Sequence, residues 1–222
     1  MSDSFPPLAA NATRLRVAQG LVLLFHATGL VGLLFSHDPG FYLRFTPLTL
    51  LLSAVLLVAF QPERNASFWQ FCLTVGLLGY AAEVVGVHTG KLFGNYAYGD
   101  TLGPKWFDVP PLIGLNWVIM TYLAGMLAQR LPLGELGRTL VAALLMVGFD
   151  LCVELPAGRF DFWHWTAGVI PFRNFRDWFI LACLAQMLFN RARFIKTNAL
   201  VPLLYVVQLL FFFALEWLGP SK

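Results

Sequence analysis

Two carboxylates, Asp150 and Glu154, stand four residues apart inside an apolar run and are the clearest candidates for chemistry in this sequence. On a helix, residues at this spacing share one face. Two carboxylates so close in a weakly solvated site cannot both ionise at low cost, so one is expected to keep its proton while the other remains a base. Glu83, in a second apolar run, strengthens this expectation if it faces the same cavity. The alternative is a polar cluster that only fixes helix packing.

A protonated carboxyl in a dry pocket lined by aromatic rings suits the protonation of an isolated trisubstituted C=C bond. Bulk water would quench the resulting tertiary carbocation unselectively, whereas aromatic faces stabilise a desolvated cation by about 2 kcal/mol or more. A second carboxylate can then take a proton from an incoming water molecule. Substrates with such double bonds are isoprenoid and dissolve in lipid. The residues are compatible with this chemistry, although composition alone does not identify the substrate.

The composition indicates that lipid is the main solvent of this chain. Of its 222 residues, 58% are hydrophobic and 12% are charged, whereas a soluble domain carries about 25% charged residues. Many of the Phe and Trp residues lie at the ends of apolar runs, where membrane interfaces favour aromatic side chains. The net charge of +3 is small and scattered, which argues against a nucleic-acid partner. Cys72, Cys152 and Cys183 stand singly, without a CxxC pair or a histidine at ligand spacing, and are predicted to be packing residues.

A spanning helix needs about 20 mostly apolar residues, and seven segments approach this length. We predict an all-α fold, a polytopic integral membrane helical bundle that forms a single domain over residues 1–222. The predicted transmembrane spans are 17–35, 41–60, 68–87, 111–129, 136–155, 174–189 and 199–218. The sixth of these is the shortest.

The odd-numbered spans run in the same direction, so their C-terminal ends are predicted to lie on one side of the membrane. The long connections 89–110 and 157–173 are predicted to emerge on that side, beside the three carboxylates. The candidate substrate-binding residues there are Phe93, Tyr96, Tyr98, Asn116, Trp117, Trp163, Trp165, Asn174 and Trp178. One end of the bundle is therefore expected to be acidic and aromatic, while the other carries mostly arginine. His26, in mid-span, is interpreted as a hydrogen-bonded packing residue.

The stretch from Glu83 to Pro104 has the spaced pattern ExxGxxxGxxFGxYxYxxxLGP. A second block comprises residues 150–154, the Trp163 and Trp165 pair, Pro171, Asn174-Phe175 and Trp178-Phe179. With Val109-Pro110 and Trp117, these residues resemble the membrane-bound carotenoid biosynthesis protein family, which includes carotenoid 1,2-hydratases. The matching residues run from about 80 to 180. The chain departs from the family in having Glu154-Leu155-Pro156 in place of Asp-Pro, and Asp177 in place of Gly, which adds a charge beside the expected pocket mouth.

The resemblance implies cofactor-free hydration of the terminal C1=C2 double bond of an acyclic carotenoid end group to a tertiary alcohol. Asp150 or Glu83 would deliver the proton, a neighbouring carboxylate such as Glu154 would activate water, and Asn116 or Asn174 would position that water. The aromatic residues would line the polyene path and hold the cation, with the 93–98 loop as a lid. No metal is expected. The implied partners are the carotenoid, water and membrane lipid, with other carotenoid-pathway enzymes possible, and the implied setting is the inner membrane of a prokaryotic cell.

Three other functions are alternatives to hydration. End-group cyclisation would use the same acid but exclude water, so its product would be isomeric with the substrate. Prenyl transfer needs paired Asp-rich motifs that hold Mg²⁺ and diphosphate, and the Asp150 and Glu154 pair stands alone. A non-catalytic pigment-binding protein is the third. A retinal protein would need a lysine within 199–218, where there is none. A haem protein would need histidines that face each other at similar depth, and His26 in mid-span with His88 and His164 near one surface argues against it.

Overall fold

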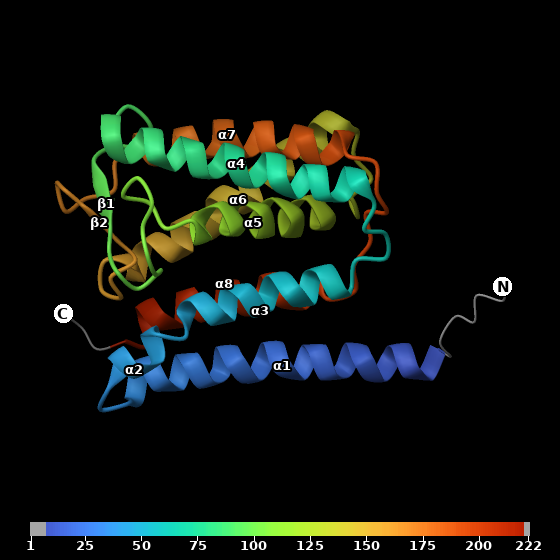
Figure 1. Cartoon of the computed structure of the whole chain (residues 1–222), viewed down its shortest axis with the longest axis horizontal. Coiled ribbons are helices and arrows are strands. Elements are labelled where there is room, and N and C mark those ends of the chain that lie inside the picture. Colours follow the sequence, from blue (N-terminus) through green and yellow to red (C-terminus); the bar gives the residue numbers. More distant parts are fainter. Residues whose placement is uncertain (1–7, 220–222) are drawn as a thin grey trace.

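The protein is a bundle of helices that carries a small two-stranded sheet at one end (Figure 1). The computed structural model describes residues 8–219. The helices are α1 (Leu8–Phe35), α2 (Pro39–Leu43), α3 (Thr46–Ala59), α4 (Ala66–Thr89), α5 (Leu112–Ala128), α6 (Glu135–Ala157), α7 (Phe172–Arg191) and α8 (Val201–Trp217). The strands are β1 (Tyr96–Tyr98) and β2 (Trp163–Trp165). The predicted all-α helical bundle is confirmed.

Four stretches of the described residues are long and apolar enough to cross a membrane. They are Ala12–Phe35, Pro39–Ala59, Ala66–Thr89 and Glu135–Ala157. Helices α5 and α8 are also apolar but have only 17 residues each. Large apolar side chains such as Val17, Leu73 and Leu144 are exposed on the outside of the bundle, as expected where lipid is the solvent. The chain is therefore a membrane protein, and the number of seven crossings stays a prediction.

The predicted span 41–60 is not one continuous helix. The structure divides it into α2 and α3, with Arg44 and Phe45 between them. Pro47 lies in the first turn of α3. A proline has no N–H to donate and its ring clashes with the carbonyl four residues earlier, so it is tolerated at a helix start and not in a helix interior. The chain therefore begins a new helix at Thr46.

Helix α5 lies at the centre of the bundle, and most of its residues are buried. Its contact with α4 is close because glycines face each other or face large rings. A Cβ atom at Gly79 would lie only 2.1 Å from Cγ of Trp117, and one at Gly114 would lie 2.9 Å from the carbonyl oxygen of Gly76. Small residues let helix backbones approach in this way in membrane proteins. Trp117 is thereby fixed against the backbone of α4.

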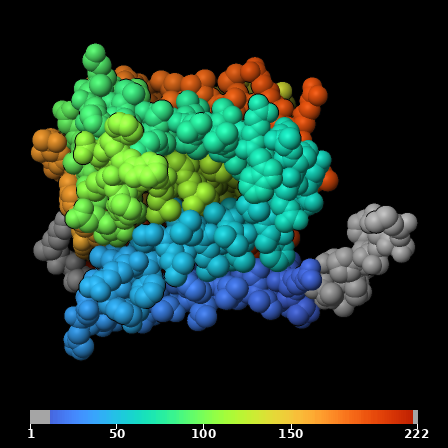
Figure 2. All heavy atoms as spheres, in the orientation of Figure 1, coloured from blue at the N-terminus to red at the C-terminus, as the bar shows by residue number. Residues whose placement is uncertain are grey.

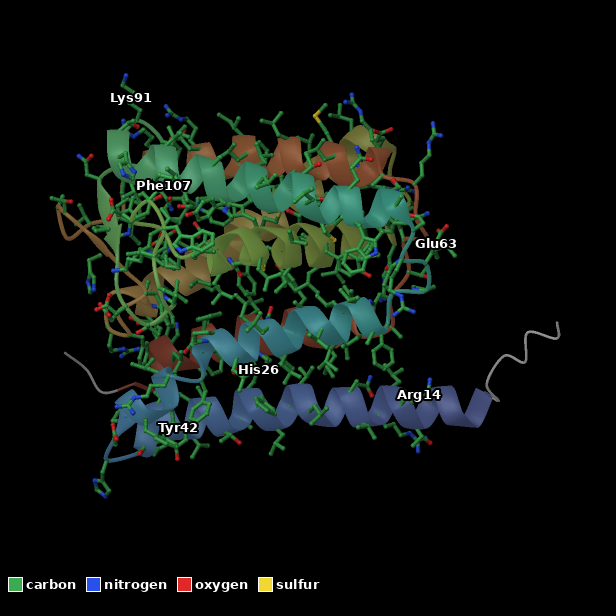
Figure 3. The ribbon with its side chains drawn as sticks, viewed as in Figure 1. Arg14, His26, Tyr42, Glu63, Lys91 and Phe107 are labelled. Atoms are coloured by element: carbon green, nitrogen blue, oxygen red, sulfur yellow. The ribbon has the colours of Figure 1, made fainter. Side chains whose placement is uncertain are left out.

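The two ends of the bundle differ in structure. Figure 3 places Lys91 and Phe107 at the end that carries β1 and β2, and Glu63 at the opposite end. At the first end, long loops connect α4 to α5 and α6 to α7, and each loop contains one of the two strands. The loops 89–110 and 157–173 therefore lie at the same end of the molecule.

Replacing Gly79 with alanine should destabilise the protein, because the new methyl group would collide with the Trp117 ring. Overpacking of this kind costs about 1–3 kcal/mol. Thermal unfolding of the purified protein in detergent measures the change. Gly20→Ala is the matched control, since no atom lies within 4 Å of a Cβ added there, and its unfolding temperature should stay the same or rise. Equal unfolding temperatures for Gly79→Ala and the wild type would contradict the close packing of α4 on Trp117.

Candidate active site

Strands β1 and β2 pair in antiparallel fashion and bring the two long loops together. Tyr96 is opposite Trp165, and Tyr98 is opposite Trp163. Successive side chains of a strand point to opposite faces, so these four rings lie on one face, and both tyrosines are buried. The spacing of two residues between the tyrosines, and between the tryptophans, is therefore the alternation that a β-strand produces. These strands were not predicted from the sequence, although the alternation of aromatic residues indicates them.

The loop that leads into β1 is fixed at its start. Helix α4 ends at Gly90, whose φ of 61° is the left-handed conformation that glycine adopts at no steric cost. Phe93 also has a positive φ, of 62°, which is rare for a bulky side chain. Its backbone N–H donates to Asp177 Oδ2 at 2.9 Å, and Arg176 pairs with the other oxygen of Asp177 at 2.8 Å. Asp177, which was expected to add a charge beside the pocket mouth, is a buried carboxylate that anchors the loop.

Glu83 accepts three hydrogen bonds in the interior. Its Oε2 atom accepts from the hydroxyl of Tyr96 at 2.5 Å and from that of Tyr98 at 2.9 Å. Its Oε1 atom accepts from the indole N–H of Trp117 at 3.1 Å. Burial, followed by the charge of Glu83, raises the pKa of both tyrosines. Both hydroxyls therefore stay protonated and act as donors.

Glu154 also accepts three hydrogen bonds, two of them from the other strand and one from α7. The indole N–H groups of Trp163 and Trp165 donate to Oε2 at 2.9 and 2.8 Å, and the Asn174 amide donates to Oε1 at 3.1 Å. The two tryptophans were predicted to line the polyene path. They do line the cavity, and their N–H groups also hold a carboxylate.

Of the three carboxyl groups that line the cavity, Asp150 accepts the fewest hydrogen bonds. Among the described residues only the Asn174 amide donates to it, at 3.2 Å from Oδ2. The same nitrogen of Asn174 also reaches Glu154, so one amide bridges the two carboxyl groups. Within residues 8–219, no set of three or more His, Cys, Asp or Glu side chains is placed to hold a metal ion.

One cavity of about 530 Å³ unites the candidate residues. Small-molecule sites typically measure about 300–1,000 Å³. All three predicted carboxylates and all nine predicted substrate-binding residues line it. Trp117 and Trp178 stack face to face within its wall, with ring centroids 4.2 Å apart. Asn116 lines the cavity from α5 and, among the described residues, makes no side-chain hydrogen bond like those of Asn174.

The other half of this cavity was not predicted from the sequence. Its walls there come from α1, α2, α3 and α8, and include His26, Thr49, Gln208 and Phe211. His26 was predicted to be a packing residue, and it does bond to the Val22 carbonyl and contact the Phe211 ring edge-on. These helices lie outside the residues that matched the family motifs, and an apolar lining has the same composition as any lipid-embedded helix. No local pattern could have identified them.

Outside the cavity, a surface carboxylate joins the two loops. Asp161 Oδ1 lies 2.7 Å from Nε2 of His164, and its Oδ2 accepts from the backbone N–H of Asp100 at 2.7 Å. The hydrogen bond with His164, then that with Asp100, lowers the pKa of Asp161. The ionised form of Asp161 therefore stabilises the contact between the loops.

These features define a membrane-embedded helical bundle whose end encloses acidic groups beneath a two-stranded aromatic lid. Residues 45–218 match the family described as "Carotenoid biosynthesis protein". The chain belongs to this family, as the motifs indicated. It is also 29% identical over 182 residues to a bisanhydrobacterioruberin hydratase of Haloarcula japonica, a match that covers 77% of this chain and 60% of that protein. No solved structure matches the chain.

Tyr98→Phe should destabilise the protein more than Tyr205→Phe. The first change removes a donor from the Glu83 carboxylate, and hydrogen bonds to charged groups contribute about 1.5–3 kcal/mol. The second removes a neutral bond to the Leu145 carbonyl, for which about 0.5–1.5 kcal/mol is typical. Chemical unfolding of both variants in detergent gives the comparison. Equal losses would show that Glu83 carries no charge that Tyr98 stabilises.

Protection of the Asp100 amide from hydrogen exchange should depend on pH through Asp161. Because the pKa of Asp161 is lowered in the folded protein, its stabilising effect is complete above its ordinary value of 3.8 and is lost as the pH falls through the lowered value. Exchange measured by mass spectrometry, corrected for intrinsic rates, tests this. Asp161→Asn should reduce protection at neutral pH, whereas Asp108→Asn, at an exposed pair with His88, should not. Protection that is independent of pH in the wild type would contradict the role of Asp161.

Proposed function

We propose that this protein hydrates the terminal C1=C2 double bond of an acyclic carotenoid end group, in the inner membrane of a prokaryotic cell. The observation that carries the proposal is the unequal treatment of three carboxyl groups around one cavity. Glu83 and Glu154 each accept three hydrogen bonds, while Asp150 accepts one. Family membership and a relative that is named a hydratase support the same chemistry.

Asp150 is the proton donor in this proposal. Hydrogen bonds donated to a carboxylate favour its charged form, so Glu83 and Glu154 are the groups that carry negative charge. Two negative charges beside Asp150, in a site with little water, favour the protonated form of the third carboxyl. Asp150 thus holds a proton while facing the same cavity as the substrate.

The reaction begins when Asp150 gives its proton to C2, the alkene carbon that bears hydrogen. The electron pair of the double bond forms the new C–H bond, which leaves a tertiary cation at C1. The stacked rings of Trp117 and Trp178 and the charges of Glu83 and Glu154 stabilise this cation. Burial makes this stabilisation strong and keeps other nucleophiles away.

Water completes the reaction. Its oxygen bonds to C1, and Glu154 takes the proton that the water loses. Asn174, which already contacts both carboxyl groups, positions this water through its side-chain oxygen. The proton then returns from Glu154 to Asp150 across the short distance that Asn174 bridges. The substrate has gained one water molecule, and the protein is unchanged.

Expression of the chain in a lycopene-producing bacterium tests the proposal. The pigment should gain one or two molecules of water, as measured by mass spectrometry. Asp150→Asn should lower the rate of hydration by about 10²–10⁴-fold, the usual contribution of a general acid. Asp108→Asn, at an exposed position, should leave the rate unchanged.

Three results would contradict the proposal. A pigment isomeric with lycopene would indicate cyclisation, because that reaction uses the same acid but adds no water. Unchanged pigment in cells that contain folded protein would indicate a binding protein or a different substrate. Equal activity of Asp150→Asn and the wild type would remove Asp150 from the mechanism.

A further inference from the structure

The cavity is larger than the space around the carboxyl groups and continues across the bundle toward α1. We propose that this second half is a channel for the hydrocarbon chain of the substrate, with a mouth that opens sideways to lipid between α1 and the α2–α3 segment. The inference rests on the proposed function, since it identifies where the unreacted part of a long polyene lies while its end group is beside Asp150.

The channel walls are mostly apolar and aromatic. Phe149 of α6 and Phe211 and Phe212 of α8 line the cavity between the carboxyl groups and α1. Phe212 contacts Phe149 edge-on with ring centroids 5.9 Å apart, and contacts Phe211 at 5.3 Å. A flat conjugated chain can lie against such rings through dispersion contacts. This part of the cavity therefore suits a hydrocarbon and not a charged ligand.

Exposure of the lining residues locates the mouth. The carboxyl groups at the inner end belong to residues that are at most 6% exposed, whereas Leu24, Phe41 and Phe45 at the outer end are 59%, 49% and 44% exposed. Residues that both line the cavity and lie on the surface mark where the two meet. Leu24 belongs to α1, Phe41 belongs to α2, and Phe45 directly precedes α3. The mouth therefore opens on an apolar face of the bundle.

One feature makes this side of the bundle suitable for entry. Helix α3 buries only Ser53 and Leu57, so few contacts hold it in place, and elements with few buried contacts open most readily. Tyr42 lies against α1, where its ring occupies the space beside Gly32. Figure 3 shows His26 and Tyr42 along this side of α1.

A second surface hollow competes for the same role. Figure 2 shows a depression between α3 and α5, and a pocket of about 580 Å³ is lined there by residues that include Leu77, Leu115 and Val118. This pocket shares no lining residue with the carboxyl cavity. A chain whose end group lies beside Asp150 would have to pass through a wall to reach it. The continuous cavity therefore favours the mouth beside α1.

Thr28→Trp and Thr49→Trp test the channel, because both residues line its outer half. Each should lower hydration of a full-length polyene at least 10-fold. Hydration of a short isoprenoid with the same terminal dimethyl alkene should stay within 2-fold of wild type, since that molecule fits inside the inner half. Leu77→Trp, in the separate hollow, is the matched control and should leave both rates unchanged. Two channel variants are compared so that the misfolding of one does not decide the result. Thermal unfolding shows whether each variant is folded.

A binding measurement separates failure of the channel from failure of the proposed function. In the Asp150→Asn background, the amount of lycopene that purifies with the protein is read from its visible absorbance, and co-purified phospholipid is measured as phosphorus. Thr28→Trp should reduce retained lycopene at least 5-fold. The wild type could fail to hydrate any substrate while Thr28→Trp still reduces the retention of lycopene. In that case the proposed reaction is wrong and the channel is supported.

Other outcomes overturn the channel itself. If both channel variants hydrate and retain the polyene like the wild type, the chain does not pass between α1 and α3. The same conclusion follows if Leu77→Trp is the variant that loses activity, since the chain would then lie between α3 and α5. Retention of phospholipid in place of lycopene, with polyene hydration unaffected by the channel variants, would make the space a lipid site.

Discussion

The structure depends on the need to satisfy carboxyl groups that are buried in an apolar bundle. An unpaired buried carboxylate is expensive, and in lipid no water is available to reduce that penalty. Glu83 is satisfied by donors from β1 and α5, and Glu154 by donors from β2 and α7. The helices therefore require the two loops, and the loops are ordered because the carboxylates accept from them.

This constraint also explains why the lid is a sheet. Two residues that donate to one buried oxygen must point the same way, and alternate positions of a strand do so. Tyr96 and Tyr98 meet this requirement on one strand, and Trp163 and Trp165 meet it on the other. Pairing of the strands supplies backbone hydrogen bonds that neither short segment could form alone. The lid and the acidic chamber are thus one unit, with the Asp177 carboxylate holding the loop at Phe93.

The same arrangement separates a polar end of the cavity from a mostly apolar end. Polar donors gather where β1, β2, α5 and α7 meet, while α1, α3 and α8 supply mostly apolar walls. A long polyene has the same division, with one reactive double bond at its end and an inert chain behind it. A cavity that is polar at its inner end and open to lipid at its outer end can select an end group and leave the chain in an apolar environment.

The sequence by itself determined that this is a helical membrane protein, where most of its helices lie, and which carboxylates, tyrosines and tryptophans surround the cavity. It could do so because the length of an apolar run and the rarity of a charge within it are local properties of the chain. The break before Pro47 is likewise a local effect, because a proline is tolerated at a helix start and not in a helix interior. Only the tertiary structure decided the pairing of β1 with β2, the donors of each carboxyl group and the part that α1, α3 and α8 play in the cavity. Each of these joins residues far apart in the chain, so it follows from how the helices pack and not from any one segment.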